Sequence, residues 1–138
     1  MHLPDWLVRA APRYARIALG ASFLSGIASR FGLWGKDVGY GSFEAFERYT
    51  AEVNAFMPRA TIPFLAWAAT IAELGLGVAL VLGLWPRAMS LASAALLAMF
   101  GLAMAVSLGI KSPLDYSVFS ASAAALLLAV GHPGTEHP

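Results

Sequence analysis

Cysteine is absent from the 138-residue chain, and histidine and charged residues are scarce. Without cysteine the chain can form no disulfide bond, hold no iron–sulfur cluster by thiolates and perform no thiol chemistry. The three histidines, His2, His132 and His137, lie in the terminal segments. Paired histidine ligation of a haem inside a membrane is therefore not expected. A formal net charge of +1 gives no electrostatic reason to expect a nucleic-acid partner.

Apolar residues replace the missing polar ones. They make up 59% of the chain and charged residues 12%, against roughly 45–50% and about 25% in soluble domains. The mean hydropathy is +0.68. This composition leaves too little polar surface to cover a water-soluble globule, so it predicts a membrane protein. Its length fits a single membrane domain over residues 1–138.

Four segments are apolar enough to be membrane helices, which need about 20 residues to cross the hydrocarbon core. The uncharged centre of the first, residues 17–29, is short, and Arg16 and Arg30 are expected to extend it by reaching the two interfaces. A signal peptide is the alternative interpretation of this segment, and the three spans that follow favour the membrane helix. The predicted spans cover residues 14–33, 62–85, 88–108 and 114–130.

Residues 31–61 are more polar than the spans on either side. A glycine-rich loop is followed by Ser42, a suitable N-cap. Phenylalanine and other apolar residues then recur at helical spacing and predict an amphipathic helix over residues 42–57, lying in the membrane interface. Two roles remain open for it: a lid over the ends of the spans, or a docking surface for an extracytoplasmic partner.

These elements predict an all-α protein: a four-helix transmembrane bundle with an amphipathic interfacial helix between spans one and two. The turn at residues 85–87 is very short, so spans two and three are expected to be antiparallel neighbours. Arg9, Arg13 and Arg16 precede or begin the first span and favour an orientation with both termini inside. The predicted location is the cell (inner or plasma) membrane.

Small residues in the spans predict close contacts between helices. Two series of small residues recur at every fourth position in the first span, and Gly26 belongs to one of them. A third such series begins at Gly75 in the second span. Ala69 and Gly77 stand four residues on either side of Glu73. Such spacing lets two membrane helices approach closely, so a helix–helix seam is expected on or near the face that carries Glu73.

Glu73 is the only charged residue of the second span and lies near its middle. A carboxylate there costs roughly 2.5–3.5 kcal/mol, so it is expected to face protein rather than lipid. Serines on spans one and four match its depth. Arg30 lies about 10 Å along the helix axis from mid-membrane, a gap that two extended side chains can span, so a Glu73–Arg30 pair is also open. Glu73 is either part of a ligand or proton site or a buried hydrogen-bonded organiser of the helices. The candidate ligand-binding residues are Glu73, Arg30, Ser22, Ser25, Ser120 and Ser122.

The segments RIALGASFLSGIASRFGLWG, FEAFERYTAEVNAFMP, ATIAELGLGVALVLGLWPRAMSLASA and SLGIKSPLDYSVFSASAAALLL resemble DoxX-type membrane proteins. The resemblance covers about residues 13–130 and places Glu73 at the usual acidic position of the family. It implies a four-helix integral membrane protein. Family members include small subunits tied to quinone-linked sulfur oxidation or to terminal oxidases, and others that assemble with secreted redox enzymes.

We therefore expect a non-catalytic subunit or scaffold of a membrane redox system, quinone-linked or respiratory, rather than an enzyme acting on its own. The alternative is a small-molecule or quinone-binding or transport protein with its intramembrane site at Glu73. No metal or cofactor motif is present, and a quinone is the one cofactor kept open. The expected partners are the lipid bilayer and a redox-enzyme subunit docking on residues 31–61, with a second copy of the chain as an open alternative.

Overall fold

The computed structural model describes residues 1–131, so His132 and His137 lie outside the described residues. Within residues 1–131 all regular structure is helical and no strand is present, which confirms the all-α class. The helices are α1 (Asp5–Arg30), α2 (Phe43–Val53), a 3-10 turn η1 (Arg59–Thr61), α3 (Ile62–Leu82), α4 (Pro86–Leu108), α5 (Lys111–Asp115) and α6 (Val118–Gly131).

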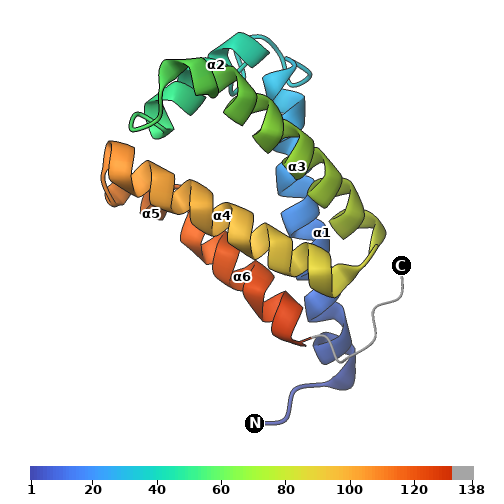
Figure 1. Ribbon diagram of the computed structural model, residues 1–138. Coiled ribbons are helices and arrows are strands. Elements are labelled where there is room, and N and C mark those ends of the chain that lie inside the picture. The colour runs from blue at the N-terminus through green and yellow to red at the C-terminus, as the bar shows by residue number, and fades with distance from the viewer. Residues whose placement is uncertain (132–138) are drawn as a thin grey trace.

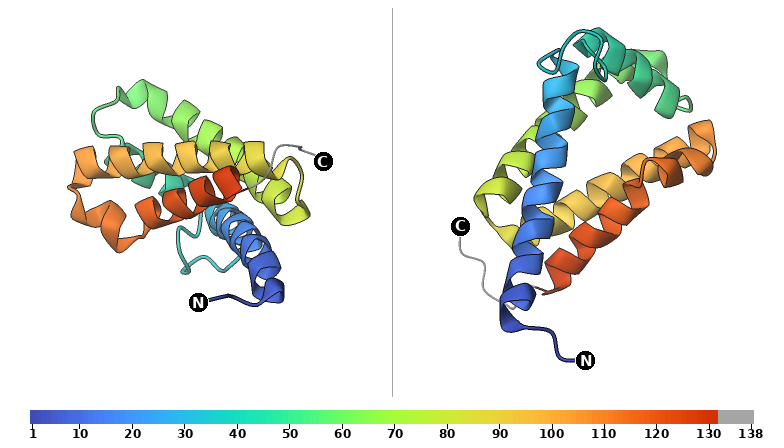
Figure 2. Two further views of the ribbon diagram at one scale, coloured as in Figure 1. Left: turned by 90° about the horizontal axis from the view of Figure 1, so that it is seen from below. Right: turned by 180° about the vertical axis from the view of Figure 1, so that it is seen from behind.

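The long helices form two close pairs, α1 with α3 and α4 with α6 (Figure 1). The pairs meet where a short turn joins α3 to α4, which we call the narrow end, and splay apart towards α2 and α5, the wide end (Figure 2). The amphipathic helix α2 lies across the wide end and contacts both α3 and α4. The fold is thus two helix pairs joined at one end and covered at the other.

The expectation that spans two and three are antiparallel neighbours holds only near their turn. Gly83 adopts φ 76° and Trp85 φ 41°, and two left-handed residues so close together reverse the chain sharply. Beyond the turn α3 packs mainly on α1 and α4 mainly on α6. A short loop fixes where two helices begin to separate, and the side chains along each helix decide which partner it follows.

Glycines set the closest approach within each pair. A Cβ atom on Gly20 of α1 would lie 2.8 Å from the carbonyl oxygen of Gly77 on α3, and one on Gly101 of α4 would lie 2.6 Å from the ring of Phe119. The seam expected at Gly77 is therefore present. Gly26 and Gly75 themselves do not lie at a close contact, because a Cβ at either position meets no atom within 4 Å.

The helix ends follow local chemistry at some places and not at others. The Ser42 hydroxyl accepts a hydrogen bond from the Ala45 amide at 3.1 Å, so the predicted N-cap of α2 is confirmed. The fourth predicted span is interrupted: α5 ends at Asp115, and Ser117 has a φ of 57° before α6 begins. This left-handed residue breaks the hydrogen-bond ladder of one continuous helix.

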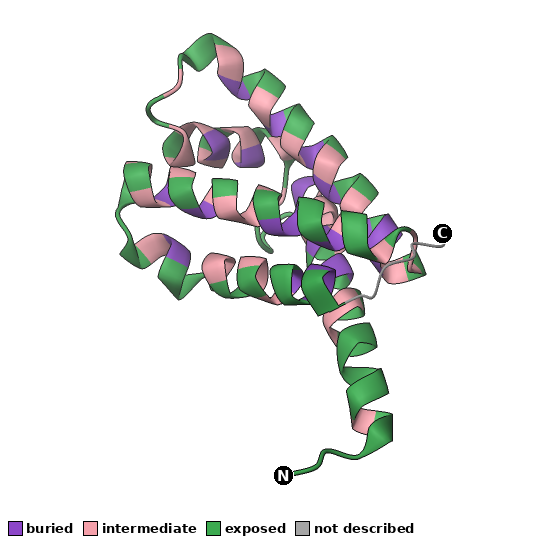
Figure 3. Ribbon diagram, turned by 60° about the horizontal axis from the view of Figure 1, so that its bottom comes forward, coloured by how far each residue is buried: buried purple, intermediate pink, exposed green. Residues whose placement is uncertain are grey.

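Among residues 1–131, two helices have the length and hydropathy to cross a membrane: the segment Arg59–Leu82, which includes α3, and α4 over Pro86–Leu108. Helix α6 is apolar but has only fourteen residues. Large apolar side chains such as Phe64, Ile71 and Val106 are exposed on α3 and α4, and exposed positions run along the outer faces of the helices (Figure 3). Lipid contact suits such a surface better than water does.

Candidate functional site

A buried ion pair joins the end of α1 to the middle of α3. The Nη2 atom of Arg30 donates a hydrogen bond to Oε2 of Glu73, and the two residues are only 4% and 7% exposed. The Nη1 atom of Arg30 donates to the Thr70 hydroxyl at 3.1 Å. The sequence left two places open to Arg30, the membrane interface and a pair with Glu73, and the structure has the pair. The pairing removes the cost of leaving either charge alone in an apolar surrounding.

Helix α2 covers this ion pair from the wide end. The ring of Phe46, a buried residue on the inner face of α2, lies over the Arg30 guanidinium at 3.7 Å from its centroid. This is a cation–π contact, which is stronger where water is excluded. The Tyr40 ring packs edge-on against Phe46 at 5.1 Å. Helix α2 therefore acts as a lid over the pair, one of the two roles left open for it.

The loop before α2 is tied to the end of α1. The backbone amide of Tyr40 donates to the Ser29 hydroxyl at 2.8 Å, and the Gly41 amide donates to the Ser29 carbonyl at 3.1 Å. The rings of Tyr40 and Tyr49 lie 5.6 Å apart. Burial, and then the nearby Tyr49 hydroxyl, raises the pKa of Tyr40 to about 12. The phenol beside the lid thus stays neutral well beyond its ordinary range.

Three aromatic rings join α1, α2 and α3 beside the ion pair. The rings of Phe43 and Trp67 stack at 4.3 Å, and Phe31 stacks on Phe43 at 5.6 Å. Phe31 and Trp67 remain exposed on their outer sides. This stack holds the lid against both helices that supply the charges.

The serines of α1 that were candidates for the Glu73 site lie elsewhere. The Ser22 hydroxyl donates to the Ala18 carbonyl of its own helix at 2.9 Å, and Ser22 is exposed. The Ser25 hydroxyl accepts from the Trp34 indole at 3.1 Å. Neither hydroxyl forms a hydrogen bond with Glu73.

The serines of α6 are also separate from the ion pair. The Ser122 hydroxyl donates to the Ala94 carbonyl at 2.7 Å and so links α6 to α4. Ser120 is exposed. Of the six candidate residues, the structure brings together only Glu73 and Arg30. A ligand-binding role for these residues stays a prediction.

Thr70, Phe46 and Tyr40 belong to the site and were not candidates. Thr70 precedes Glu73 by three residues, so helical spacing alone places both on one face of α3. Phe46 lies on the apolar face of the amphipathic helix, which signals burial but not the partner. No sequence signal pointed to Tyr40, because its place depends on how the glycine-rich loop folds back.

The site contains the Arg30–Glu73 ion pair and one donor that is free for a further hydrogen-bond acceptor. The Nε atom of Arg30 is buried and has no hydrogen-bond partner among the residues that the structure describes. It could donate to a carbonyl or other small oxygen acceptor. No cluster of three or more histidine, cysteine, aspartate or glutamate residues lies within residues 1–131 to hold a metal ion.

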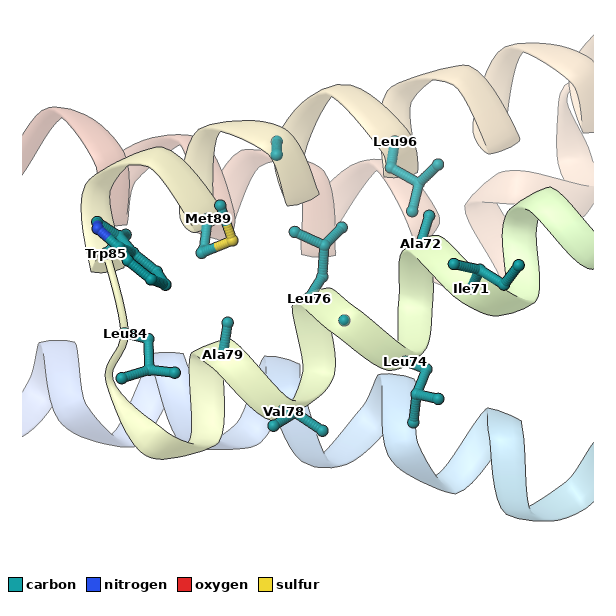
Figure 4. Close-up of a pocket in the computed structure, with 12 residues that line it drawn as sticks. Ile71, Ala72, Leu74, Leu76, Val78, Ala79, Leu84, Trp85, Met89 and Leu96 are labelled. Atoms are coloured by element: carbon teal, nitrogen blue, oxygen red, sulfur yellow. The ribbon is translucent and has the colours of Figure 1, made fainter. Parts of the chain in front are cut away.

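A separate apolar groove lies between α3 and α4. Its volume is about 890 Å³, and it is lined by aliphatic side chains such as Ile71 and Leu96, with Trp85 and Met89 near the narrow end (Figure 4). Glu73 does not line it. The groove follows from the splay of the helix pairs and is distinct from the ion pair.

The chain matches the model of a known protein family. A family model described as DoxX matches residues 11–109. The matched region contains both Arg30 and Glu73 and runs through α4 to its C-cap Gly109. No curated protein and no solved structure matches the chain.

Proposed function

Because the chain belongs to the DoxX family, we propose that this membrane protein is a non-catalytic subunit or scaffold of a membrane redox system, quinone-linked or respiratory. In this proposal four spans cross the cell membrane, with α5 and α6 together forming the fourth. Both termini face the cytoplasm. The lid helix α2 then lies on the extracytoplasmic side, where a partner enzyme subunit can reach it.

The burial of the Arg30–Glu73 ion pair beneath α2 is the observation that supports this role. The Arg30 guanidinium contacts Glu73, Thr70 and the Phe46 ring at once, and all four residues are buried. The Glu73 carboxylate is held by Arg30 beneath an aromatic lid, so it is not open to a substrate in this arrangement. These residues organise three helices and leave the outer surface of the lid for recognition.

The outer face of α2 offers charged groups to a partner. Glu44 and Arg48 form an exposed ion pair at 3.1 Å, and Glu52 is exposed one turn further on. Exposed pairs of this kind add little to stability, commonly below about 1 kcal/mol. These charges can therefore contribute to the choice of partner, since charge complementarity determines binding specificity more than affinity.

Copurification tests the scaffold role. The full chain is tagged at its C-terminus and extracted from its native membranes with a mild detergent. We expect a redox-enzyme subunit to copurify with the wild type, to be lost with Glu44→Lys and to be kept with Asp115→Lys. Both variants break an exposed i,i+4 ion pair, and only the first lies in the 31–61 segment. Recovery of the chain alone, or equal loss from both variants, would count against the proposal.

A quinone or related small molecule bound beside Glu73 is the second candidate. The unpartnered Nε atom of Arg30 favours it, because a buried donor without an acceptor is costly and a ligand carbonyl would supply the missing oxygen. Arg30 would hold such a headgroup, and Glu73 would fix the guanidinium. The quinone itself would supply the redox chemistry.

Binding of a water-soluble short-chain quinone tests this candidate. Trp67 lies in the aromatic stack beside the pair, so saturable quenching of tryptophan emission is the readout. We expect quenching in the wild type and in Ser122→Ala, and at least tenfold weaker quenching in Glu73→Gln. Equal quenching in all three proteins would exclude a quinone site at Glu73.

A further inference from the structure

The narrow end of the molecule gathers arginines from two helices. Arg9, Arg13 and Arg16 recur at spacings of four and three residues, which places them on one face of α1. The Nη1 atom of Arg16 donates to the carbonyl of Leu80 at 2.8 Å, so this face turns towards the end of α3. Arg87 lies in the first turn of α4, directly after the α3–α4 turn. Four arginines therefore belong to the narrow end of the fold.

This positive charge is not neutralised within the described residues. Arg9, Arg13 and Arg87 are exposed and form no ion pair with any residue in 1–131. Asp5 is the only acidic residue of α1. The Arg16 guanidinium already donates a hydrogen bond to the Leu80 carbonyl near the C-terminal end of α3. The other three arginines are available to an anion from outside the chain.

The apolar groove begins at the same end. Leu84 and Trp85 close it beside the turn, and Ile71 marks its far end (Figure 4). Leu84 follows Ile71 by thirteen positions of helix and turn, which correspond to about 20 Å at 1.5 Å per residue. One leaflet of a bilayer is roughly 15 Å deep, half of the hydrocarbon thickness. The groove thus has the length and the lining for one acyl chain.

We propose that the narrow end binds an anionic phospholipid, with its phosphate among Arg9, Arg13 and Arg87 and an acyl chain in the groove between α3 and α4. Guanidinium groups bind phosphate through paired hydrogen bonds. A lipid meets both features at once, because its headgroup and its tail are joined. A soluble anion would leave the groove unused, and the headgroup cation of a zwitterionic lipid would oppose the arginines.

Lipid titration of the purified full chain tests the headgroup half of the proposal. Native mass spectrometry from a neutral detergent measures binding of phosphatidylglycerol and of phosphatidylcholine with identical acyl chains. We expect phosphatidylglycerol to bind at least tenfold more tightly. The triple variant Arg9→Gln/Arg13→Gln/Arg87→Gln should bind it roughly a hundredfold more weakly, from about fivefold per arginine. The three substituted residues are exposed, so the variant is expected to melt at the wild-type temperature.

A matched set of cations at the wide end provides the control. Lys36→Gln/Arg48→Gln/Arg59→Gln removes the same charge from exposed positions away from the α3–α4 turn. Its affinity for phosphatidylglycerol should equal that of the wild type. Equal weakening in the two triple variants would overturn the site, as would equal binding of the two lipids. Full competition by millimolar inorganic phosphate would overturn the lipid as its ligand.

Filling the groove tests the acyl-chain half. A Cβ atom added to Gly75 meets open space, so Gly75→Leu places a side chain in the groove without a clash. Gly26→Leu makes the same change at an equally open position on α1. We expect about tenfold weaker binding of phosphatidylglycerol in Gly75→Leu and wild-type binding in Gly26→Leu. Unchanged binding in Gly75→Leu would show that the chain does not lie in the groove.

Discussion

Arg30 and Glu73 are the only charged side chains that the fold buries within residues 1–131. Their contacts come from three elements, since Arg30 ends α1, Glu73 and Thr70 belong to α3, and Phe46 belongs to α2. Forming such a pair gains little net free energy, because desolvation offsets much of the attraction. Breaking it is costly, because one charge is then left without a partner. The pair therefore makes the position of α2 depend on the packing of α1 and α3.

Removal of one charge of the Arg30–Glu73 pair should lower the free energy of unfolding more than removal of both charges. We expect Glu73→Ala to lower the free energy of unfolding by about 3 kcal/mol, because it leaves the Arg30 charge buried and unpaired. The double variant Arg30→Met/Glu73→Leu should lose about 1 kcal/mol or less. Unfolding of each variant in mild-detergent micelles, by titration with a denaturing detergent, measures both losses of free energy. Glu52→Ala, at an exposed position of α2, is the control. A double variant less stable than Glu73→Ala would contradict the pairing.

Tyr40 provides a pH-dependent reporter of the lid. Burial raises its pKa from 10.0 to about 12, so the folded protein holds this proton to a higher pH than the unfolded chain does. The stability that Tyr40 contributes is complete below about pH 10 and is lost as the pH rises towards 12. Titration of tyrosinate absorbance should show a late step that Tyr40→Phe removes. Loss of a step near pH 10 instead would contradict the burial of Tyr40.

At the scale of the elements, each helix pair has a close contact at a glycine. The α1–α3 crossing places Gly20 against Gly77, and the α4–α6 crossing places Gly101 against Phe119. Helices in lipid gain little from burying apolar surface against each other, so close packing carries much of their association. These crossings hold the two pairs, whereas α3 and α4 share mainly their turn.

Added volume at the α1–α3 crossing should weaken that pair selectively. Gly20→Val would bring its Cβ atom to 2.8 Å from the Gly77 carbonyl oxygen and from a Val81 methyl group. We expect a loss of about 1–3 kcal/mol, typical of overpacking, and a lower melting temperature in detergent. Gly26→Val lies on the same helix, where a Cβ meets open space, and it should not share the loss. Similar melting of the two variants would show that the crossing does not limit the pair.

Helices were predictable from the sequence, and their partners were not. Hydropathy and the punctuating Pro63, Gly83 and Gly109 locate α3 and α4 to within a few residues, because those signals are local. The same hydropathy gave no sign of the break at Ser117, which rests on a single left-handed residue. Which helices pair depends on side-chain shapes on two elements at once, so the sequence alone predicted the wrong extent of contact between α3 and α4.

The candidate site was predictable to the same degree. A lone carboxylate inside an apolar span draws attention to Glu73, and length along α1 brings Arg30 within reach. The serines at matching depth were predicted to contact Glu73 and do not, because depth in the membrane does not determine how a helix is rotated about its axis. A turn of about 100° per residue separates neighbours on the surface. Ser22 and Ser25 thus share the depth of Glu73 without sharing its face.

At the scale of the whole molecule, the two ends differ in chemistry. The narrow end carries Arg9, Arg13, Arg16 and Arg87, whereas the wide end carries the aromatic stack and the lid. Positive charge beside the first span favours the cytoplasmic side. This division gives the proposed orientation a physical basis, because in that orientation the narrow end would face the inner leaflet and the wide end would face the outside.

Single cysteines can test the number of spans and the orientation together, because the chain has no cysteine of its own. The positions are Asp5, Asp37, Arg87, Lys111 and Gly131, which precede, separate or follow the apolar helices. With four spans and both termini inside, a membrane-impermeant maleimide should label Asp37→Cys and Lys111→Cys in intact cells. The other three variants should react only after permeabilisation, and the cysteine-free parent should never react. Labelling of Asp5→Cys and Gly131→Cys together with Asp37→Cys would mean that only α3 and α4 cross the membrane.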